Sequence, residues 1–288
     1  MRKNQLFEKF VHGIFLILGL LTIACVLLIS IYLIISGIPA IRKIGLFDFL
    51  LGDVWASTAD EAQFGILPFI LTSIYGTIGA IMIGVPIGIL TAIYLSKMAS
   101  EKIKSIVGSA VSLLAGIPSV VYGLVGMIVL VPFVRNTFKI ADGASLFSAM
   151  IVLAIMILPS IIKMSITALD AVPKEYEDAS LALGATPIET YFKVSLPAAK
   201  SGIAAAVVLG VGRAIGEAMA VMMVSGNMPN MPNSLFQSVQ FLTTAVASEM
   251  SYSSGLQREA LFSIALVLFV FIMLINLLLN YFLKREKE

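Results

Sequence analysis

The sequence predicts an all-α integral membrane protein with six transmembrane helices. Hydrophobic residues make up 59% of its 288 residues, charged residues make up 12%, and the mean hydropathy is +1.01. A soluble domain is less apolar than this, whereas a protein whose surface faces lipid requires such a composition. The net charge of +2 is too small to indicate binding to nucleic acid.

Six apolar runs are long enough to cross a membrane, for which a helix needs about 20 residues. They cover residues 13–37, 65–96, 105–133, 145–168, 202–225 and 259–283. The first run exceeds a signal-peptide core and lacks a small-residue cleavage site, so we expect it to be retained. We divide the chain into residues 1–64, the first span with its external loop, and residues 65–288, a core with five spans.

The distribution of lysine and arginine orients these spans. With the N-terminus inside the cell, thirteen of these residues fall in cytoplasmic segments and five in external loops. This agrees with the positive-inside rule, so both termini and the loop 169–201 are expected to be cytoplasmic.

The sequences of the two longest external loops also predict structural features. Residues 37–63 hold Trp55 and other aromatic residues among acids, which is typical of either an interfacial anchor or a docking surface for an external partner. In the last external loop, residues 235–247 predict a short re-entrant or surface helix that does not span the membrane.

The loop 169–201 predicts two short helices joined by a sharp turn. Pro173 suits the start of the first helix, and Gly184 suits a left-handed cap at its end. Thr186 and Glu189 then form a capping box that begins the second helix. Leu196-Pro197 is expected to end that helix, whose apolar ridge needs a covering surface and consists of Ile188, Tyr191 and Phe192.

This loop resembles the coupling loop of the permease subunits of bacterial ABC importers, whose pattern is Glu-Ala-Ala, three residues, Gly, nine residues, Ile, one residue, Leu-Pro. Asp178-Ala179-Ser180, Gly184 and Val194-Ser195-Leu196-Pro197 stand at those positions. The resemblance implies a helix that docks into a groove of a separate ATPase subunit, the alternative being a hairpin with only a packing role. The residues assigned to coupling are Glu177, Asp178, Ala179, Ser180, Gly184, Ile188, Tyr191, Leu196 and Pro197.

The third apolar run is interrupted by the stretch LAGIPSVVYG at residues 114–123. Pro118 has no N–H for the carbonyl one turn back, and inside a membrane that carbonyl must be satisfied by protein or by a water-lined cavity. We assign Gly116 and Pro118 to a helix break and Ser119 and Tyr122 to a substrate path; a simple proline kink is the alternative.

The fifth apolar run carries the two charged residues Arg213 and Glu217. Their spacing of four predicts one shared helix face near mid-membrane. Each charge costs about 2.5 to 3.5 kcal/mol there, so such residues are functional candidates by default. We assign both to the substrate path, and a structural ion pair is the alternative.

Residues 114–123 and the stretch GRAIGEAMA at 212–220 resemble two elements of the PstC-type permeases of phosphate ABC importers. The resemblance implies the type I ABC importer permease fold in a bacterial or archaeal cell membrane. It also implies a PstA-type sister permease, two copies of an ATPase and an external phosphate-binding protein. In this hypothesis Arg213 would donate to phosphate in transit, and Glu217 would hold and neutralise Arg213 when the path is empty.

The sequence contains no G-x-x-x-x-G-K-[ST] motif, so we expect no enzyme activity in this chain, with ATP and Mg²⁺ bound by the partner ATPase. A single cysteine and a single histidine argue against a metal cluster. Three other functions remain: a permease for sulfate or molybdate, an ion-coupled secondary transporter and a membrane signalling scaffold. Only one mid-span acid, Glu217, is available for ion coupling.

Overall fold

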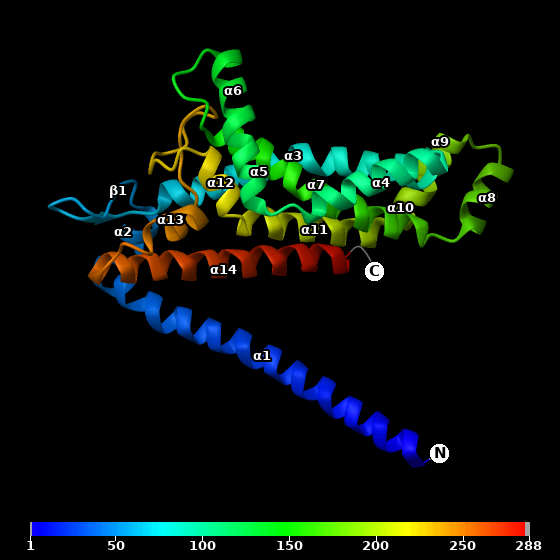
Figure 1. Cartoon of the computed structure of the whole chain (residues 1–288), viewed down its shortest axis with the longest axis horizontal. Helices are drawn as coiled ribbons and strands as arrows, with labels where there is room; N and C mark the ends of the chain where they lie inside the picture. The colour runs from blue at the N-terminus through cyan, green and yellow to red at the C-terminus, as the bar shows by residue number, and fades with distance from the viewer. Residues whose placement is uncertain (1, 286–288) are drawn as a thin grey trace.

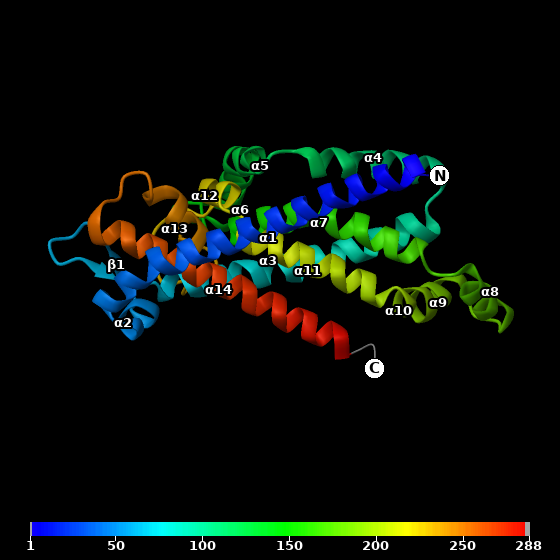
Figure 2. The same ribbon diagram turned by 90° about the horizontal axis from the view of Figure 1, so that it is seen from below.

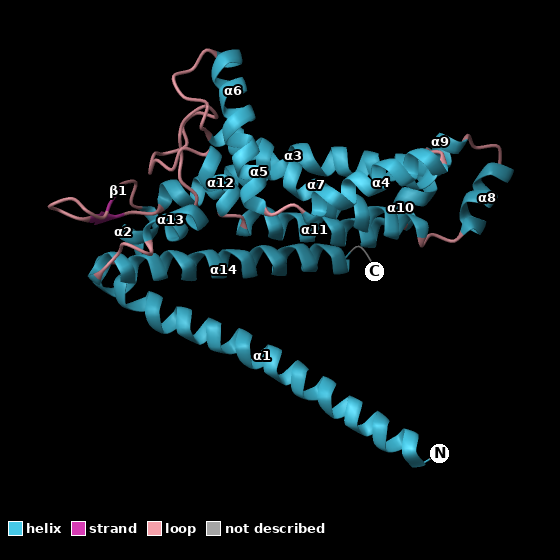
Figure 3. Cartoon of the chain, in the orientation of Figure 1, coloured by secondary structure: helices cyan, strands magenta, loops and turns pink. Residues whose placement is uncertain are grey.

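The computed structural model describes residues 2–285, and nearly all of its regular structure is helical (Figures 1 and 3). Its first half contains α1 (Arg2–Ile44), α2 (Leu46–Leu51), β1 (Trp55–Ala56), β2 (Gln63–Phe64), α3 (Leu67–Ile93), η1 (Tyr94–Met98), α4 (Glu101–Gly116), α5 (Ser119–Val125), η2 (Gly126–Leu130) and α6 (Val131–Phe138). Its second half contains α7 (Leu146–Asp170), α8 (Lys174–Ala182), α9 (Pro187–Thr190), η3 (Tyr191–Ser195), α10 (Leu196–Ala198), α11 (Lys200–Gly216), α12 (Met219–Val224), α13 (Leu242–Glu249) and α14 (Gly255–Arg285). The η segments are π-helical turns.

The long helices other than α1 lie side by side, and the molecule has two distinct ends (Figures 1 and 2). The hairpin end carries β1, β2 and α13, and the loop end carries α8, α9 and α10. The start of α1 and the finish of α14 also lie at the loop end (Figure 1). Both ends of the described chain therefore share a side with the loop 169–201, here called the coupling loop after the resemblance described above.

Within the described residues, five helical segments are long and apolar enough to cross a membrane: Phe10–Ile44, Leu67–Met98, Ser119–Phe138, Leu146–Asp170 and Gly255–Leu278. A sixth candidate is a broken one: Pro187–Ala198 lies at the loop end, α11 lies within the bundle, and the two meet at a bend of 71°. The predicted all-α membrane fold is confirmed. The predicted fifth span, 202–225, is not one helix, because α11 ends at Gly216.

The centre of the bundle is α7, which packs against α3 on one side and α11 on another. Two-thirds of its most apolar stretch is buried, whereas none of the corresponding stretch of α1 is. Ile157 and Ile161 of α7 are fully buried, in contact with the small residues of the neighbouring helices. Burial of branched side chains against small ones allows the close helix approach typical of membrane proteins.

The third predicted span, 105–133, is two separate segments. The chain breaks at Ile117 and Pro118, and α5 with α6 then turns away from the direction of α4 (Figures 1 and 2). Proline cannot donate the bond that would continue α4, so its position sets the corner.

The β-hairpin pairs Trp55 with Phe64 and closes over the hairpin end. Trp55 is 6% exposed, and its indole N–H donates to the carboxylate of Glu249 at 3.2 Å, which also accepts from Gln257 at 3.1 Å. The interpretation of Trp55 as an interfacial anchor is therefore wrong, because the ring lies in the core with its polar atom satisfied inside the protein. Phe47 of the same loop remains exposed.

The last loop forms a helix later than predicted, at α13, and that helix packs inside the protein. The backbone N–H of Leu242 donates to Ser73 of α3 at 3.0 Å. Before it, the ring of Phe236 lies 4.5 Å from that of Phe138. These long-range contacts hold residues 235–241 in a non-helical path.

The first helix contacts α14 mainly toward the hairpin end and diverges from it toward the loop end (Figure 1). The rings of Tyr32 and Phe262 meet edge to face with centroids 5.6 Å apart. Nearby, the hydroxyl of Ser263 donates to the carbonyl of Gly37.

Candidate functional site

The coupling loop adopts the two predicted helices. Gly184 has a positive φ of 88°, which confirms the left-handed cap, because glycine adopts this conformation without steric penalty. The capping box is also confirmed: the hydroxyl of Thr186 accepts from the backbone of Glu189 at 3.3 Å, and the Glu189 carboxylate accepts from the backbone of Thr186 at 3.1 Å. Leu196-Pro197 does not end this helix, which runs to Ala198 and bends at Ala199.

The capping box lowers the pKa of the Glu189 carboxyl. The backbone N–H of Thr186, the ammonium of Lys193 and the Thr186 hydroxyl hold the pKa of Glu189 at about 2, below its usual 4.5. Because the folded pKa is depressed, the stabilisation of the first turn of α9 is present above about pH 4.5 and is lost as the pH falls toward 2. We expect a carbon-13 NMR titration of the Glu189 carboxyl to show a midpoint near 2 in the folded protein.

A matched pair of substitutions checks the cause of this shift. Thr186→Ala removes the hydroxyl but keeps the backbone N–H, so it should raise the midpoint of Glu189 only part of the way toward 4.5, whereas Thr186→Ser keeps both capping bonds and should leave it low. A wild-type midpoint near 4.5 would contradict the capping-box geometry.

Apolar side chains remain uncovered on the coupling loop. Leu183, which follows α8, is 90% exposed, and Ile188 of α9 is 57% exposed; both helices lie at the loop end (Figure 1). The exposed large apolar residues of this surface, here called the loop face, are Tyr176, Leu181, Leu183, Ile188 and Phe192. Exposed apolar side chains gathered on a polar segment are typical of a protein–protein contact.

The predicted coupling residues divide into two groups. An outward group is exposed and consists of Asp178, Ala179, Gly184, Ile188 and Pro197. An inward group is partly buried against the rest of the chain and consists of Glu177, Ser180, Tyr191 and Leu196. In the inward group, the hydroxyls of Ser180 and Thr190 bond at 2.9 Å and join α8 to α9.

The predicted helix break at Gly116 and Pro118 is present and internally satisfied. The carbonyl of Leu114, which would accept from residue 118 in a continuous helix, accepts instead from the hydroxyl of Tyr122 at 2.7 Å. It also accepts from the backbone of Ile117 at 3.2 Å. The expectation that protein groups satisfy the freed carbonyl is confirmed, and the hydroxyl of Tyr122 stabilises the corner.

A second break, which the sequence reasoning missed, separates α11 from α12. Glu217 has an extended backbone just after α11, and its carboxylate accepts from the N–H of Ala220 at 3.0 Å. Its carbonyl accepts from the hydroxyl of Thr243 at 2.8 Å. The pair Gly216-Glu217 is the available signal, since glycine is common where helices end and an acid is favourable where the next one begins.

The two breaks lie against each other, because α5 packs on α12. A Cβ added to Gly123 would lie 2.8 Å from the Cα of Ala220, so this contact requires glycine. Ser119 opens α5, one residue after the first break. The breaks thus place irregular backbone inside the protein, where membrane proteins tolerate it.

Arg213 does not share a helix face with Glu217, and that prediction is wrong. The helix ends between them, and the Glu217 carboxylate is occupied by the start of α12. Arg213 is half-buried and donates to the hydroxyl of Ser160 at 3.3 Å, and among the described residues no carboxylate forms an ion pair with it. It therefore keeps most of its donors for another acceptor.

Arg213 lines a cavity of about 700 Å³ together with Ser160, Met164, Ala205, Val208, Leu209, Gly212 and Asn276. Tyr122 lines a different cavity of about 480 Å³, whose walls are almost wholly apolar. Ser119 and Tyr122 therefore lie on α5 next to the break, whereas Arg213 lines a different cavity, which is mostly apolar and whose polar residues are Arg213, Ser160 and Asn276.

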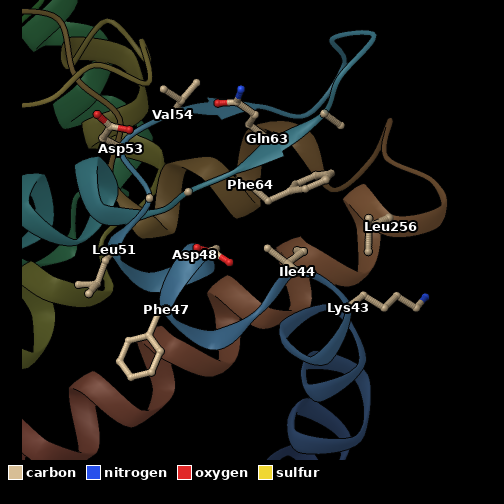
Figure 4. Close-up of a pocket in the computed structure, with 13 residues that line it drawn as sticks. Lys43, Ile44, Phe47, Asp48, Leu51, Asp53, Val54, Gln63, Phe64 and Leu256 are labelled. Atoms are coloured by element: carbon tan, nitrogen blue, oxygen red, sulfur yellow. The ribbon is translucent and has the colours of Figure 1, made fainter.

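A further pocket of about 610 Å³ lies at the hairpin end. Figure 4 shows Asp48 of α2 beneath strand β2, which carries Phe64, while Phe47 points the opposite way. The described residues contain no group of three or more His, Cys, Asp or Glu that could hold a metal ion.

This chain is similar to a known protein family and to several known permeases. Residues 84–288 match the family described as the binding-protein-dependent transport system inner membrane component. The chain is 38% identical to the probable ABC transporter permease protein YqgH of Bacillus subtilis, over 93% of this chain and 88% of that protein. It is 32% identical to the phosphate transport system permease protein PstC of Haemophilus influenzae, over 96% of this chain and 92% of that protein.

Solved structures agree with the fold. An inward-facing structure of the MetNI methionine ABC transporter covers 77% of this chain, and 94% of its own chain is matched, with a TM-score of 0.57 at 20% identity. An amino acid ABC transporter covers 76% of this chain, with 92% of its own chain matched, a TM-score of 0.54 and 22% identity. The chain therefore belongs to the binding-protein-dependent transport system inner membrane component family and is a multi-pass permease subunit of an ABC importer.

Proposed function

We propose that this chain is the transmembrane permease subunit of an ATP-driven phosphate importer and forms half of the translocation path. The observation that carries the proposal is the 32% identity to a phosphate transport system permease over nearly the whole of both chains. A similar protein of Pasteurella multocida with the same description is 35% identical over 78% of this chain. The chain itself is not an enzyme, and a separate subunit hydrolyses ATP.

The substrate path is proposed to include Arg213, whose planar guanidinium matches phosphate oxygens and stays charged. Its single hydrogen bond to Ser160 supports this role, because the guanidinium is charged yet not neutralised by a carboxylate of the described chain. A conduit must bind weakly enough to release its ion, and one arginine with free donors meets that need. Glu217 is assigned a different task from the one first predicted: it holds the start of α12 beside the path.

Ser119 and Tyr122 are proposed to line the path at the break: Ser119 begins α5, and the hydroxyl of Tyr122 donates to the carbonyl of Leu114. Residues 1–64 are proposed to form a peripheral unit and residues 65–288 the permease core.

The partners follow from the same proposal. A PstA-type sister permease would complete the path, an ATPase pair would bind the loop face, and an external phosphate-binding protein would contact the hairpin end. The coupling loop and both termini would be cytoplasmic, in the cell membrane of a bacterium or archaeon. No cofactor is assigned to this chain, and ATP with Mg²⁺ would be held by the ATPase.

The test is ATP-dependent uptake of labelled phosphate into liposomes that carry this chain with its sister permease, ATPase and binding protein. We expect uptake that requires this subunit and persists in an excess of unlabelled sulfate. Transport of sulfate or molybdate instead of phosphate would overturn the substrate, and transport without ATP would overturn the mechanism in favour of ion coupling.

A further inference from the structure

Two π-helical turns converge on one carboxylate at the loop end. Lys97 of η1 forms an ion pair with Glu177 of α8 at 2.7 Å, and the hydroxyl of Ser195, the last residue of η3, donates to the same oxygen at 2.8 Å. Each turn closes with a backbone hydrogen bond across five residues: the N–H of Ala99 donates to the carbonyl of Tyr94, and the N–H of Leu196 donates to the carbonyl of Tyr191. Such wide turns inside helices often occur at functional positions.

This ion pair is far less exposed than the others in the described chain. The side chains of Lys97 and Glu177 are 13% and 17% exposed, whereas those of Lys193 and Glu189 on the same loop are 74% and 46% exposed. Exposed pairs contribute little, but removing one partner of a shielded pair leaves an uncompensated charge. Loss of the Lys97–Glu177 pair should therefore destabilise the local structure more than loss of any other ion pair among the described residues.

Glu177 carries its charge in this environment. Burial, the largest single influence, raises the pKa of Glu177, but the hydrogen bonds from Lys97 and Ser195 and the charges of Lys97 and Lys174 together outweigh it. The net pKa lies below its usual value, so the carboxylate is ionised at neutral pH.

The ion pair also holds α8 in place, which apolar packing does not do. No residue of α8 is buried, so this helix is not held by a hydrophobic core. The base of the loop is held, since an apolar cluster beneath it joins α3, α7 and α11 through Ala92, Ile93, Leu169, Val172, Ala199 and Ile203. Ser96, the neighbour of Lys97 in η1, donates a hydrogen bond to the carboxylate of Asp170 at the end of α7. Polar groups of η1 therefore contact the loop both where it begins and at α8.

We propose that Glu177 is a positioning residue, held between Lys97 and Ser195, that fixes α8 to the end of α3 and passes movement of the coupling loop to that spanning helix. The proposal rests on the proposed function of the chain, and it assigns Glu177 an inward task in place of the ATPase contact predicted from the sequence. The outward residues of the same helix remain available for the ATPase.

The experiment measures phosphate uptake and ATP hydrolysis together, in liposomes that carry the complete complex. Glu177→Gln and Lys97→Met should lower the number of ions imported per ATP hydrolysed by a factor on the order of five or more, the usual scale of coupling between sites. The double exchange of Lys97→Glu with Glu177→Lys should restore most of that ratio. Ser195→Ala, which removes one hydrogen bond only, should lower it less.

The matched control is Lys193→Met, which removes a lysine of the exposed pair on the same loop and should leave the ratio unchanged. An unchanged ratio in Glu177→Gln would overturn the proposal, and so would loss of the ATPase from that complex, since a docking contact would then explain the defect. If the wild-type complex moves another anion, the substrate assignment fails while the ratio, measured with that anion, still tests the role of Glu177.

Discussion

Replacing Arg213 by alanine is expected to reduce phosphate import by roughly 10- to 100-fold, since hydrogen bonds to charged groups contribute about 1.5 to 3 kcal/mol. The complex should still assemble, because removing a charge from a membrane helix lowers the cost of its insertion. The measurement is the rate of ATP-dependent phosphate uptake, normalised to the amount of complex in the liposomes.

Two companion variants separate charge from geometry at this position. Arg213→Lys keeps the charge but loses the planar fork, so its rate should lie between those of the wild type and Arg213→Ala. Ser160→Ala removes the partner that Arg213 has in the described structure and should transport close to the wild-type rate. An assembled Arg213→Ala complex with the wild-type rate would exclude Arg213 from the path.

Placing aspartate at Leu183 and Ile188 together is expected to release the ATPase from the complex. Both side chains are largely exposed, and an apolar anchor that becomes buried at an interface typically contributes about 2 kcal/mol or more, which is on the order of 30-fold in Kd. The measurement is the amount of ATPase that copurifies with the tagged permease.

The control for this variant is Tyr252→Asp; Tyr252 is 92% exposed and lies between α13 and the start of α14, which are at the hairpin end, opposite α8 and α9 (Figure 1). It should leave copurification of the ATPase unchanged. Retention of the ATPase by the double variant would show that the loop face is not the docking surface.

The features that sequence reasoning predicted correctly are those that a few neighbouring residues determine. Gly184 adopts its left-handed conformation and Thr186 caps α9 because the groups involved lie within four residues of each other. Pro118 lacks the N–H that would continue α4, and Tyr122, four residues later, satisfies the freed carbonyl; Pro86 and Pro159, by contrast, lie inside the continuous helices α3 and α7. Such local causes are visible in a single sequence.

The features that sequence reasoning missed depend on contacts between distant segments of the chain. The helix after Arg213 ends at Gly216 while Thr243 binds the carbonyl of Glu217 and Ala220 packs on Gly123. A spacing of four residues predicts a shared helix face only where the helix continues. In the same way, the sequence around Trp55 suggests an interfacial anchor, because the acceptor of its indole N–H is Glu249, which is 194 residues away.

The divergence of α1 from α14 determines the shape that this subunit presents to the bilayer. Its apolar part has 35 residues. At 1.5 Å per residue it is about 52 Å long, which exceeds the roughly 30 Å of the hydrocarbon core, so α1 is long enough to span the membrane even when tilted. Because α1 meets α14 mainly toward the hairpin end, the apolar surface along the rest of α1 is left uncovered by this chain and must face lipid or a partner subunit.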